Sequence, residues 1–174
     1  RVGGSPLRAR DGQPLPRPAL TRAETPPLDR RTRIDRMRAR AWGLQVLYAW
    51  EAQGPGGPLI EVMDSVLRNR AVSPQRVPQL IRHLRALADH LDAIDAAIRA
   101  GSENWRLERL SSVDRSILRL AVAEMLYLPE TPPKVAIQEA IRLAGQYGGR
   151  DSPRFVNGVL DAIYATHVRG AAGA

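Results

Sequence analysis

Apolar residues recur at helical spacing along most of the chain after residue 31. From about Thr32, the segment RIDRMRARAWGLQVLYAWEAQ places its apolar side chains on one stripe of a 3.6-residue helix. The segment GPGGP, residues 54–58, ends this helix and predicts a loop, because neither Gly nor Pro favours helical backbone. The predicted stripe contains Ile34, Met37, Ala41, Leu44 and Tyr48, widened by Leu47 and Trp50.

The same spacing predicts two more helices in the middle of the chain. One covers about residues 59–70, and a longer one opens at residues 73–74. In the longer segment the apolar residues keep helical spacing over residues 77–98, so we expect one continuous helix that ends at residues 101–102. A short turn is then expected to pack Trp105 into the core.

Capping residues mark the starts of the next two helices. Ser111, followed three residues later by Asp114, predicts the N-terminus of a helix that runs to about residue 128. The prolines of the segment LPETPP then break the chain, and Thr131 is expected to cap a helix that stops before the glycine pair at residues 148–149.

The segment PRFVNGVLDAIY predicts the last helix. Asp151 or Ser152 suits the N-cap, and Pro153 suits the first turn, where its missing amide hydrogen is no loss. Gly158 lies in the helix interior, where Gly is costly, so we expect close packing of the backbone there, with ligand contact as the alternative. The expected buried stripe is Phe155, Val156, Val159, Leu160, Ile163 and Tyr164.

Six or seven helices without a convincing strand predict an all-α protein. Hydrophobic residues make up 44% of the sequence and aromatic residues only 5%, which favours closely packed helices with a core of Ala, Leu, Ile and Val. We expect a disordered Arg/Pro-rich arm over residues 1–31, a helical domain over residues 32–168 and a flexible tail over residues 169–174. The chain begins with Arg rather than Met, which leaves residues upstream an open question.

Positive charge is concentrated near the N-terminus. Residues 1–40 contain 11 of the 26 Lys and Arg residues but only 4 of the 18 Asp and Glu residues. Such an arm either binds nucleic acid loosely or is a solvated tail. In the first predicted helix, Arg33, Arg36 and Arg40 are spaced i, i+3 and i+7, which aligns three guanidinium groups, and Arg38 lies in the same turns. Because guanidinium groups pair with phosphates, this pattern favours nucleic-acid binding, with a solvated helix end as the alternative.

The sequence lacks the residue patterns of an active site. It contains no Cys, which excludes disulfides and thiolate metal sites and is compatible with a reducing cytoplasm, where we expect the protein. His83 and His90 are seven residues apart and lack a third ligand at metal-binding spacing. Neighbouring Arg and carboxylate residues are expected to form surface ion pairs. No run approaches the roughly 18 apolar residues of a membrane span. We therefore expect a binding protein rather than an enzyme, with no cofactor, metal or membrane partner.

Three separated blocks carry a family resemblance: RARAWGLQVLYAWE, NWRLERLSSVDRSILRLAVAEMLY and TPPKVAIQEAIRLAGQYGGRDSPRFVNGVLDAI. Together they resemble the NusB family of bacterial transcription antitermination factors, over about residues 34–166 and in the same order. The resemblance implies a non-enzymatic all-α fold of six or seven helices, arranged as two small subdomains around a shared core. Proteins of this family bind the boxA segment of ribosomal RNA leader transcripts together with NusE, a small-subunit ribosomal protein. The complex joins elongating RNA polymerase and other Nus factors and suppresses premature termination.

The resemblance also implies roles for particular residues. The Arg-rich first helix of the family contacts RNA, a role that falls here to Arg36, Arg38 and Arg40, beside Arg33 from the spacing argument. Tyr48 and Asp114 match positions on the face that is shared by RNA and NusE. Asp151 and Phe155 match positions at the RNA-binding edge, where Phe155 either stacks on an unpaired base or belongs to the buried stripe.

Two other functions stay open at this point. One is the detached RNA-binding domain of a ribosomal RNA cytosine methyltransferase, because some of those enzymes resemble NusB at their N-terminus. A methyl-donor domain does not fit within 174 residues, so this reading requires a longer reading frame. The other is a homodimeric protein-interaction scaffold, in which the helical faces form subunit interfaces.

Overall fold

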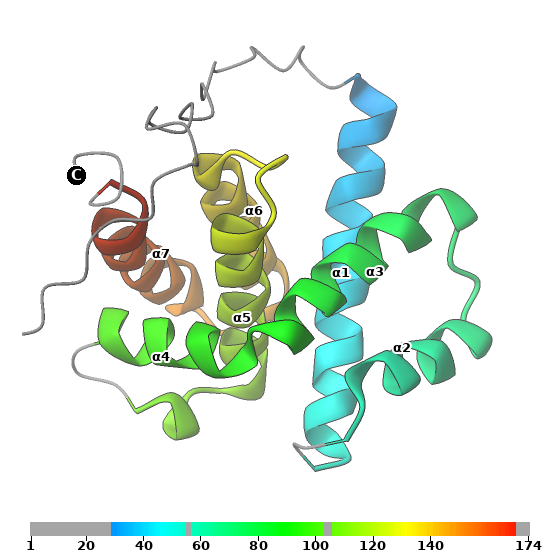
Figure 1. Cartoon of the computed structure of the whole chain (residues 1–174), viewed down its shortest axis with the longest axis horizontal. Coiled ribbons are helices and arrows are strands. Elements are labelled where there is room, and N and C mark those ends of the chain that lie inside the picture. The colour runs from blue at the N-terminus through cyan, green and yellow to red at the C-terminus, as the bar shows by residue number, and fades with distance from the viewer. Residues whose placement is uncertain (1–28, 55–56, 103–105, 170–174) are drawn as a thin grey trace, which may run out of the picture.

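The computed structural model describes residues 29–54, 57–102 and 106–169. Within these ranges the chain forms α-helices and short helical turns and no strand (Figure 1), which confirms the all-α prediction. The predicted arm before residue 29, the turn around Trp105 and the tail after residue 169 lie outside the described residues. The helices are α1 (Arg30–Ala52), α2 (Leu59–Arg68), α3 (Val77–Asp89), α4 (Leu91–Gly101), α5 (Ser112–Tyr127), α6 (Pro133–Tyr147) and α7 (Ser152–Ile163), with 3-10 turns η1 (Pro74–Arg76) and η2 (Leu107–Arg109) and a π-helical turn η3 (Tyr164–Arg169).

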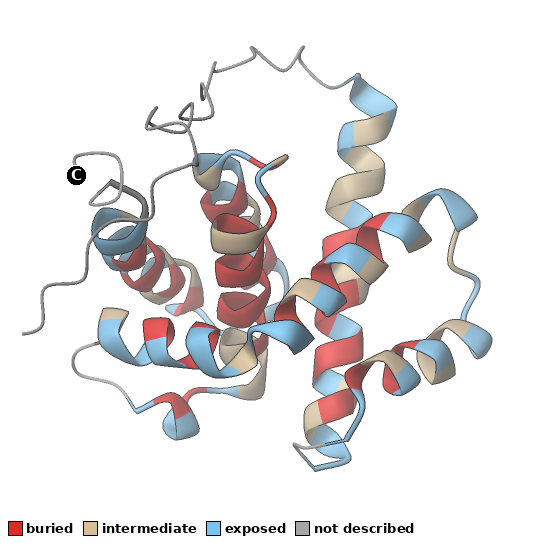
Figure 2. Ribbon diagram, viewed as in Figure 1, coloured by how far each residue is buried: buried red, intermediate tan, exposed pale blue. Residues whose placement is uncertain are grey.

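Two groups of helices share one core. Helices α1, α2 and α3 pack against one another, while α4, α6 and α7 surround α5. Helix α5 also contacts α1 and α3, and its residues from Ser116 to Met125 are all buried. Figure 2 shows buried residues along α5 and on the facing sides of its neighbours. The prediction of two small helical subdomains around a shared core is therefore confirmed.

Helix α1 begins and ends with recognisable caps. The Asp29 carboxylate accepts hydrogen bonds from the backbone amides of Arg31 at 2.8 Å and Thr32 at 3.0 Å. A hydrogen bond from the Thr32 hydroxyl, together with those two amides, lowers the pKa of Asp29. At the other end, Gly54 has a φ of 96°, a conformation that favours Gly, and the chain leaves the helix there. These caps fix where the arginine-rich turns of α1 start.

The prediction of one long helix over residues 77–98 is wrong, because the chain breaks at His90 between α3 and α4. His90 has φ −129° and ψ 21°, and its ring stacks on Tyr127 with centroids 3.8 Å apart. The apolar spacing does not reveal this break, because both helices bury their apolar faces in the same core. As a result α3 packs against α1, whereas α4 packs against α7.

The capping predictions for α5 and α6 have different outcomes. The Ser111 hydroxyl accepts a hydrogen bond from the Asp114 amide at 3.0 Å, which confirms the predicted start of α5. For α6 the prediction of Thr131 as N-cap is wrong, since Pro132 occupies that position. The Thr131 side chain is buried instead, and its hydroxyl has no partner among the described residues.

Helix α7 largely follows its predicted pattern. Asp151 occupies the N-cap position without a side-chain hydrogen bond, and Pro153 lies in the first turn. The prediction of close packing at Gly158 is wrong, because that residue faces solvent and an added Cβ would meet no atom within 4 Å. A close approach occurs at Gly101 of α4, where an added Cβ would lie 2.8 Å from Ile163 Cγ1. Within the predicted stripe, Val156, Val159, Leu160 and Ile163 are buried, whereas Phe155 and Tyr164 are half-buried.

Candidate functional site

The arginines at the start of α1 do not share one environment. Arg33 and Arg38 are exposed and Arg36 is half-buried, while only 5% of Arg40 is exposed. Because α1 meets α5 and α6 near Arg40, its guanidinium group points into the protein rather than toward solvent. The predicted alignment of three exposed guanidinium groups is therefore not formed, although the earlier turns still present arginine side chains at the surface.

Arg40 belongs to a buried cluster of charged groups. Its Nε and Nη2 donate to the two carboxylate oxygens of Glu124, at 2.8 and 2.5 Å. Its Nη1 lies 3.7 Å from Glu139 on α6, and His83 Nε2 of α3 lies 3.3 Å from Glu124 Oε1. The cluster thus joins one side chain from each of α1, α3, α5 and α6.

Glu124 remains ionised in this buried setting because its neighbours compensate for the loss of water. Burial raises the pKa of a carboxyl group, but hydrogen bonds from His83 and Arg40 outweigh that effect and lower the pKa of Glu124 to about 2. Such paired and hydrogen-bonded charges hold their helices in a defined arrangement. The role of Arg40 in this structure is consequently to attach α1 to the body of the protein.

A second network of charges connects α1, α4 and α5. Arg119 donates to both carboxylate oxygens of Asp95 at 2.8 Å and to Glu51 at 2.7 Å. Arg115 binds Glu51 through two hydrogen bonds, at 2.8 and 2.7 Å, and these bonds raise the pKa of Arg115. The prediction that such pairs lie at the surface is wrong for Arg119 and Asp95, which are both buried.

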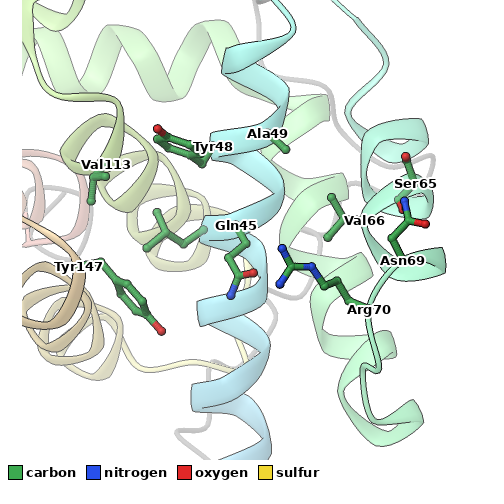
Figure 3. A pocket seen from close by; sticks show the side chains of 10 residues that line it. Gln45, Tyr48, Ala49, Ser65, Val66, Asn69, Arg70, Val113 and Tyr147 are labelled. Carbon is green, nitrogen blue, oxygen red and sulfur yellow. The ribbon is translucent and has the colours of Figure 1, made fainter.

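Tyr48 stands between two surface grooves. More than half of its surface, 54%, is exposed, although the sequence pattern assigned it to the apolar stripe. On one side lies a groove of about 480 Å³ between α1 and α2, which Tyr147 of α6 and Arg70 also line (Figure 3). On the other side lies a groove of about 490 Å³, lined by the charged network that includes Glu51 and Arg115. An exposed aromatic residue with grooves on both sides is a typical contact for a partner molecule.

Asp114 lies in the first turn of α5, next to two residues that line the grooves beside Tyr48. Its neighbour Val113 lines the groove between α1 and α2, and Ser112 lines the charged groove. Asp114 Oδ2 accepts a hydrogen bond from the Ser111 hydroxyl at 2.8 Å, whereas Oδ1 has no partner among the described residues. Asp114 itself lines neither groove, so the structure does not bring its side chain together with Tyr48.

The residues predicted at the start of α7 are partly accessible. Asp151 is exposed, and Phe155 is half-buried and packs against the core. Phe155 thus contributes to the apolar stripe and still presents part of its side chain at the surface. Helix α7 follows shortly after Tyr147, which lines the groove beside Tyr48. Along the chain, the start of α7 is therefore only a few residues away from Tyr147, the residue at the end of α6 that lines this groove.

Sequence reasoning missed the buried charges, although one signal was present. Glu124 interrupts the apolar run LAVAEMLY, and a carboxylate within such a run requires a buried partner. The pattern does not identify that partner, since Arg40 is 84 residues away. Tyr147 was also missed because it marks a helix end in the sequence, whereas 41% of its surface is exposed in the groove.

The described part of the chain shows neither a metal-binding cluster nor a membrane-spanning helix. No group of three His, Asp or Glu side chains there is placed to hold a metal ion. None of the helices in these ranges combines the length and apolar character needed to cross a membrane.

The fold and the surface define a class of protein: an all-helical domain with exposed arginines on one helix and an aromatic contact region further along it. The comparisons with known proteins give the family. The family model described as "NusB family" matches residues 37–165. The transcription antitermination protein NusB of Sorangium cellulosum is 41% identical over 128 residues, covering 74% of this chain and 90% of that protein. The corresponding protein of Solibacter usitatus is 42% identical over 129 residues, covering 74% and 87%.

Solved structures agree with the sequence relatives. NusB of T. maritima has a TM-score of 0.69 and 35% identity, covering 76% of this chain and 92% of that chain. A chain from the crystal structure of the antitermination factors NusB and NusE in complex with dsRNA has a TM-score of 0.69 and 27% identity, covering 77% and 98%. This chain belongs to the NusB family.

Proposed function

We propose that this protein is a transcription antitermination factor that binds boxA-type RNA of ribosomal RNA leader transcripts together with the ribosomal protein NusE. In this proposal it acts on elongating RNA polymerase with other Nus factors in the bacterial cytoplasm, and it has no catalytic activity. Family membership supports the proposal, since its relatives are transcription antitermination proteins and one related structure holds NusB, NusE and RNA. The single observation that carries RNA binding is the set of surface arginines on the first turns of α1.

Arg33, Arg36 and Arg38 are the proposed phosphate contacts. Arg33 and Arg38 are exposed and have no side-chain partner among the described residues. Each offers a planar set of donors that matches the oxygens of a phosphate group. Arg40 is held by Glu124 and has an indirect role in this proposal, which is to fix the orientation of the helix that carries the other three.

The start of α7 is the proposed contact for an unpaired base. The exposed carboxylate of Asp151 can accept a hydrogen bond from a base amino group but repels phosphate, so it suits a base edge rather than the backbone. The accessible part of Phe155 can stack on the same base. The RNA path would then run from the arginines of α1 toward the start of α7.

Tyr48 and Asp114 are the proposed contacts for NusE. An exposed tyrosine supplies a large apolar area and a hydroxyl, and Asp114 is a half-buried carboxylate in the first turn of α5. A protein partner that covers both residues would also cover the mouths of the two grooves.

Titration of a boxA-like single-stranded RNA, with and without NusE and at several salt concentrations, tests the proposal. Weak binding by the protein alone, strengthened by NusE, is expected, with the logarithm of affinity falling by about 0.7 per phosphate contact for each tenfold rise in salt. The double variant Arg33→Ala and Arg36→Ala should weaken binding and reduce this slope. If the affinity for RNA changes neither with salt concentration nor in this double variant, the proposal is refuted. Homodimer formation is a separate prediction, and sedimentation of the protein with and without RNA tests it.

A further inference from the structure

A hollow of about 400 Å³ lies between the first turns of α1 and the segment that leads into α3. We name it the α1–η1 cleft. One wall consists of Arg30, Arg31 and Arg38 of α1, and the other includes Gln75 and Arg76 of η1. The second wall is formed by residues about forty positions further along the chain, so the sequence pattern of α1 gives no indication of it.

The α1–η1 cleft has an excess of positive charge. Asp35 is the only carboxylate in its lining, and Arg76 Nε already donates to Asp35 Oδ1 at 3.0 Å. Arg30, Arg31 and Arg38 are exposed, and the described residues offer no partner to their guanidinium groups. Four guanidinium groups therefore face one carboxylate that is already paired.

Three other hollows among the described residues lack such an excess. The groove between α1 and α2 is lined by a single arginine, Arg70. The charged groove beside Tyr48 balances three arginines against three carboxylates. An adjacent hollow, which shares Arg31, Asp35 and Gln75 with the cleft, is lined by three arginines and two aspartates. Its Arg82 is also paired, at 3.3 Å from Glu130. Among these four hollows, the α1–η1 cleft has the largest excess of positive charge.

The geometry of the two walls suits a phosphate group. Arg31 and Arg38 are seven residues apart, so they share a face of α1 and their Cα atoms are about 10 Å apart along its axis. Arg76 approaches from the opposite wall, and its ion pair with Asp35 is partly buried, with side-chain exposures of 17% and 22%. This pair holds η1 against α1, which keeps the walls in place before an anion arrives. Donors that are fixed in this way bind with a smaller loss of conformational entropy.

We infer that the α1–η1 cleft binds phosphodiester groups of single-stranded RNA, with Arg76 and the η1 wall as part of the RNA site. This inference rests on the proposed RNA-binding function and extends it beyond α1. The strand passes over the cleft with its phosphates between Arg31, Arg38 and Arg76, and its bases remain free to reach other parts of the surface.

Charge changes at Gln75 test the inference in both directions. Gln75 is exposed and lines the cleft, so Gln75→Glu adds a negative charge and Gln75→Lys a positive charge close to the bound phosphate. We expect Gln75→Glu to weaken and Gln75→Lys to strengthen binding of a boxA-like RNA, each by roughly 3- to 10-fold at low salt. The matched controls are Gln53→Glu and Gln53→Lys, at the exposed C-cap of α1, roughly 33 Å from Arg31 along the helix. These controls should change affinity by less than about twofold, because charges this far apart are screened.

A second pair of variants uses the arginines themselves. Arg31→Ala should reduce the salt slope of RNA binding by about 0.7, the value for one lost phosphate contact. Arg109→Ala removes the same charge from the exposed η2 turn, which does not line the cleft, and should leave the slope unchanged. Unfolding midpoints of all variants show whether a change in affinity comes from a change in folding.

The outcomes separate the inference from the proposed function. If the unmodified protein binds boxA-like RNA but the Gln75 variants behave like the Gln53 variants, the cleft is not part of the RNA site and the inference fails alone. If the unmodified protein binds no RNA with or without NusE, the proposed function fails. Inorganic phosphate provides the comparison for the ligand. If it binds the Gln75-sensitive site at the same concentration of phosphate groups as RNA does, the assignment to the RNA backbone is overturned.

Discussion

Replacing Glu124 with Gln should destabilise the protein strongly, because the change leaves Arg40 buried without its main counter-charge. Two hydrogen bonds, of 2.8 and 2.5 Å, join these side chains, and only 5% of Arg40 and 2% of Glu124 are exposed. Removing one partner of a buried ion pair typically costs about 3–5 kcal/mol. The lowered pKa gives a similar magnitude: a fall from 4.5 to about 2 corresponds to roughly 3 kcal/mol. For a chain of this size, such a loss lowers the unfolding temperature by roughly 6–20 °C.

The pH dependence of this effect has a definite sign. The folded protein holds the pKa of Glu124 below its value in the unfolded chain, so the pair contributes fully above about pH 4.5. The contribution is lost as the pH falls from 4.5 toward 2. The difference in free energy of unfolding between the unmodified protein and Glu124→Gln should therefore be largest near pH 7 and shrink over this range.

Urea unfolding at pH 7, 5, 4 and 3 measures that difference. Glu139→Gln serves as the control, because Glu139 is 24% exposed and lies 3.7 Å from Arg40, so its loss should cost less than about 1 kcal/mol. Equal stability of Glu124→Gln and the unmodified protein at pH 7 would refute the reasoning. If the difference in free energy of unfolding stays constant down to pH 3, the pair stabilises the protein through its shape rather than its charge.

Two further predictions concern other parts of the chain. Gly158→Ala should raise the free energy of unfolding by about 0.5–1 kcal/mol, because an added Cβ meets nothing within 4 Å. Gly101→Ala should lower the free energy of unfolding by about 1–3 kcal/mol, because its Cβ would lie 2.8 Å from Ile163 Cγ1. Thermal unfolding of both variants checks this, and a stabilising Gly101→Ala would contradict the packing argument. Tyr48→Ala should weaken binding of NusE by roughly 10-fold or more without altering the fold. Calorimetric titration against Val135→Ala, which trims another exposed apolar residue, tests it, and equal effects of the two variants would remove Tyr48 from the interface.

The sequence predicts most helices of this protein because each buries one apolar stripe and most carry recognisable ends. The Ser111 cap and the apolar side of α7 are examples. It does not predict the break at His90, since a helical stripe stays regular when two consecutive helices face one core. At the break the His90 ring stacks on Tyr127, a contact between residues far apart in the chain that leaves no periodic signal.

The candidate site was predicted less completely, for a related reason. Spacing places Arg33, Arg36 and Arg40 on neighbouring parts of α1, but it does not show which helices cover them. Exposure of Arg33 and burial of Arg40 follow from where α5 packs against α1. The η1 wall opposite Arg31 is a tertiary contact that leaves no periodic signal in the sequence.

The buried cluster around Glu124 also fixes the register of α1. His83 Nδ1 lies 2.7 Å from the Gln79 carbonyl oxygen and Nε2 lies 3.3 Å from Glu124 Oε1, so the ring stands between α3 and the Arg40–Glu124 pair. Arg40 itself faces two carboxylates, those of Glu124 and Glu139. Rotating α1 by one residue, about 100°, would separate Arg40 from its carboxylate and leave unmatched charges in the core. The arginine-rich turns are thus presented in one orientation only, with their direction set from inside the protein.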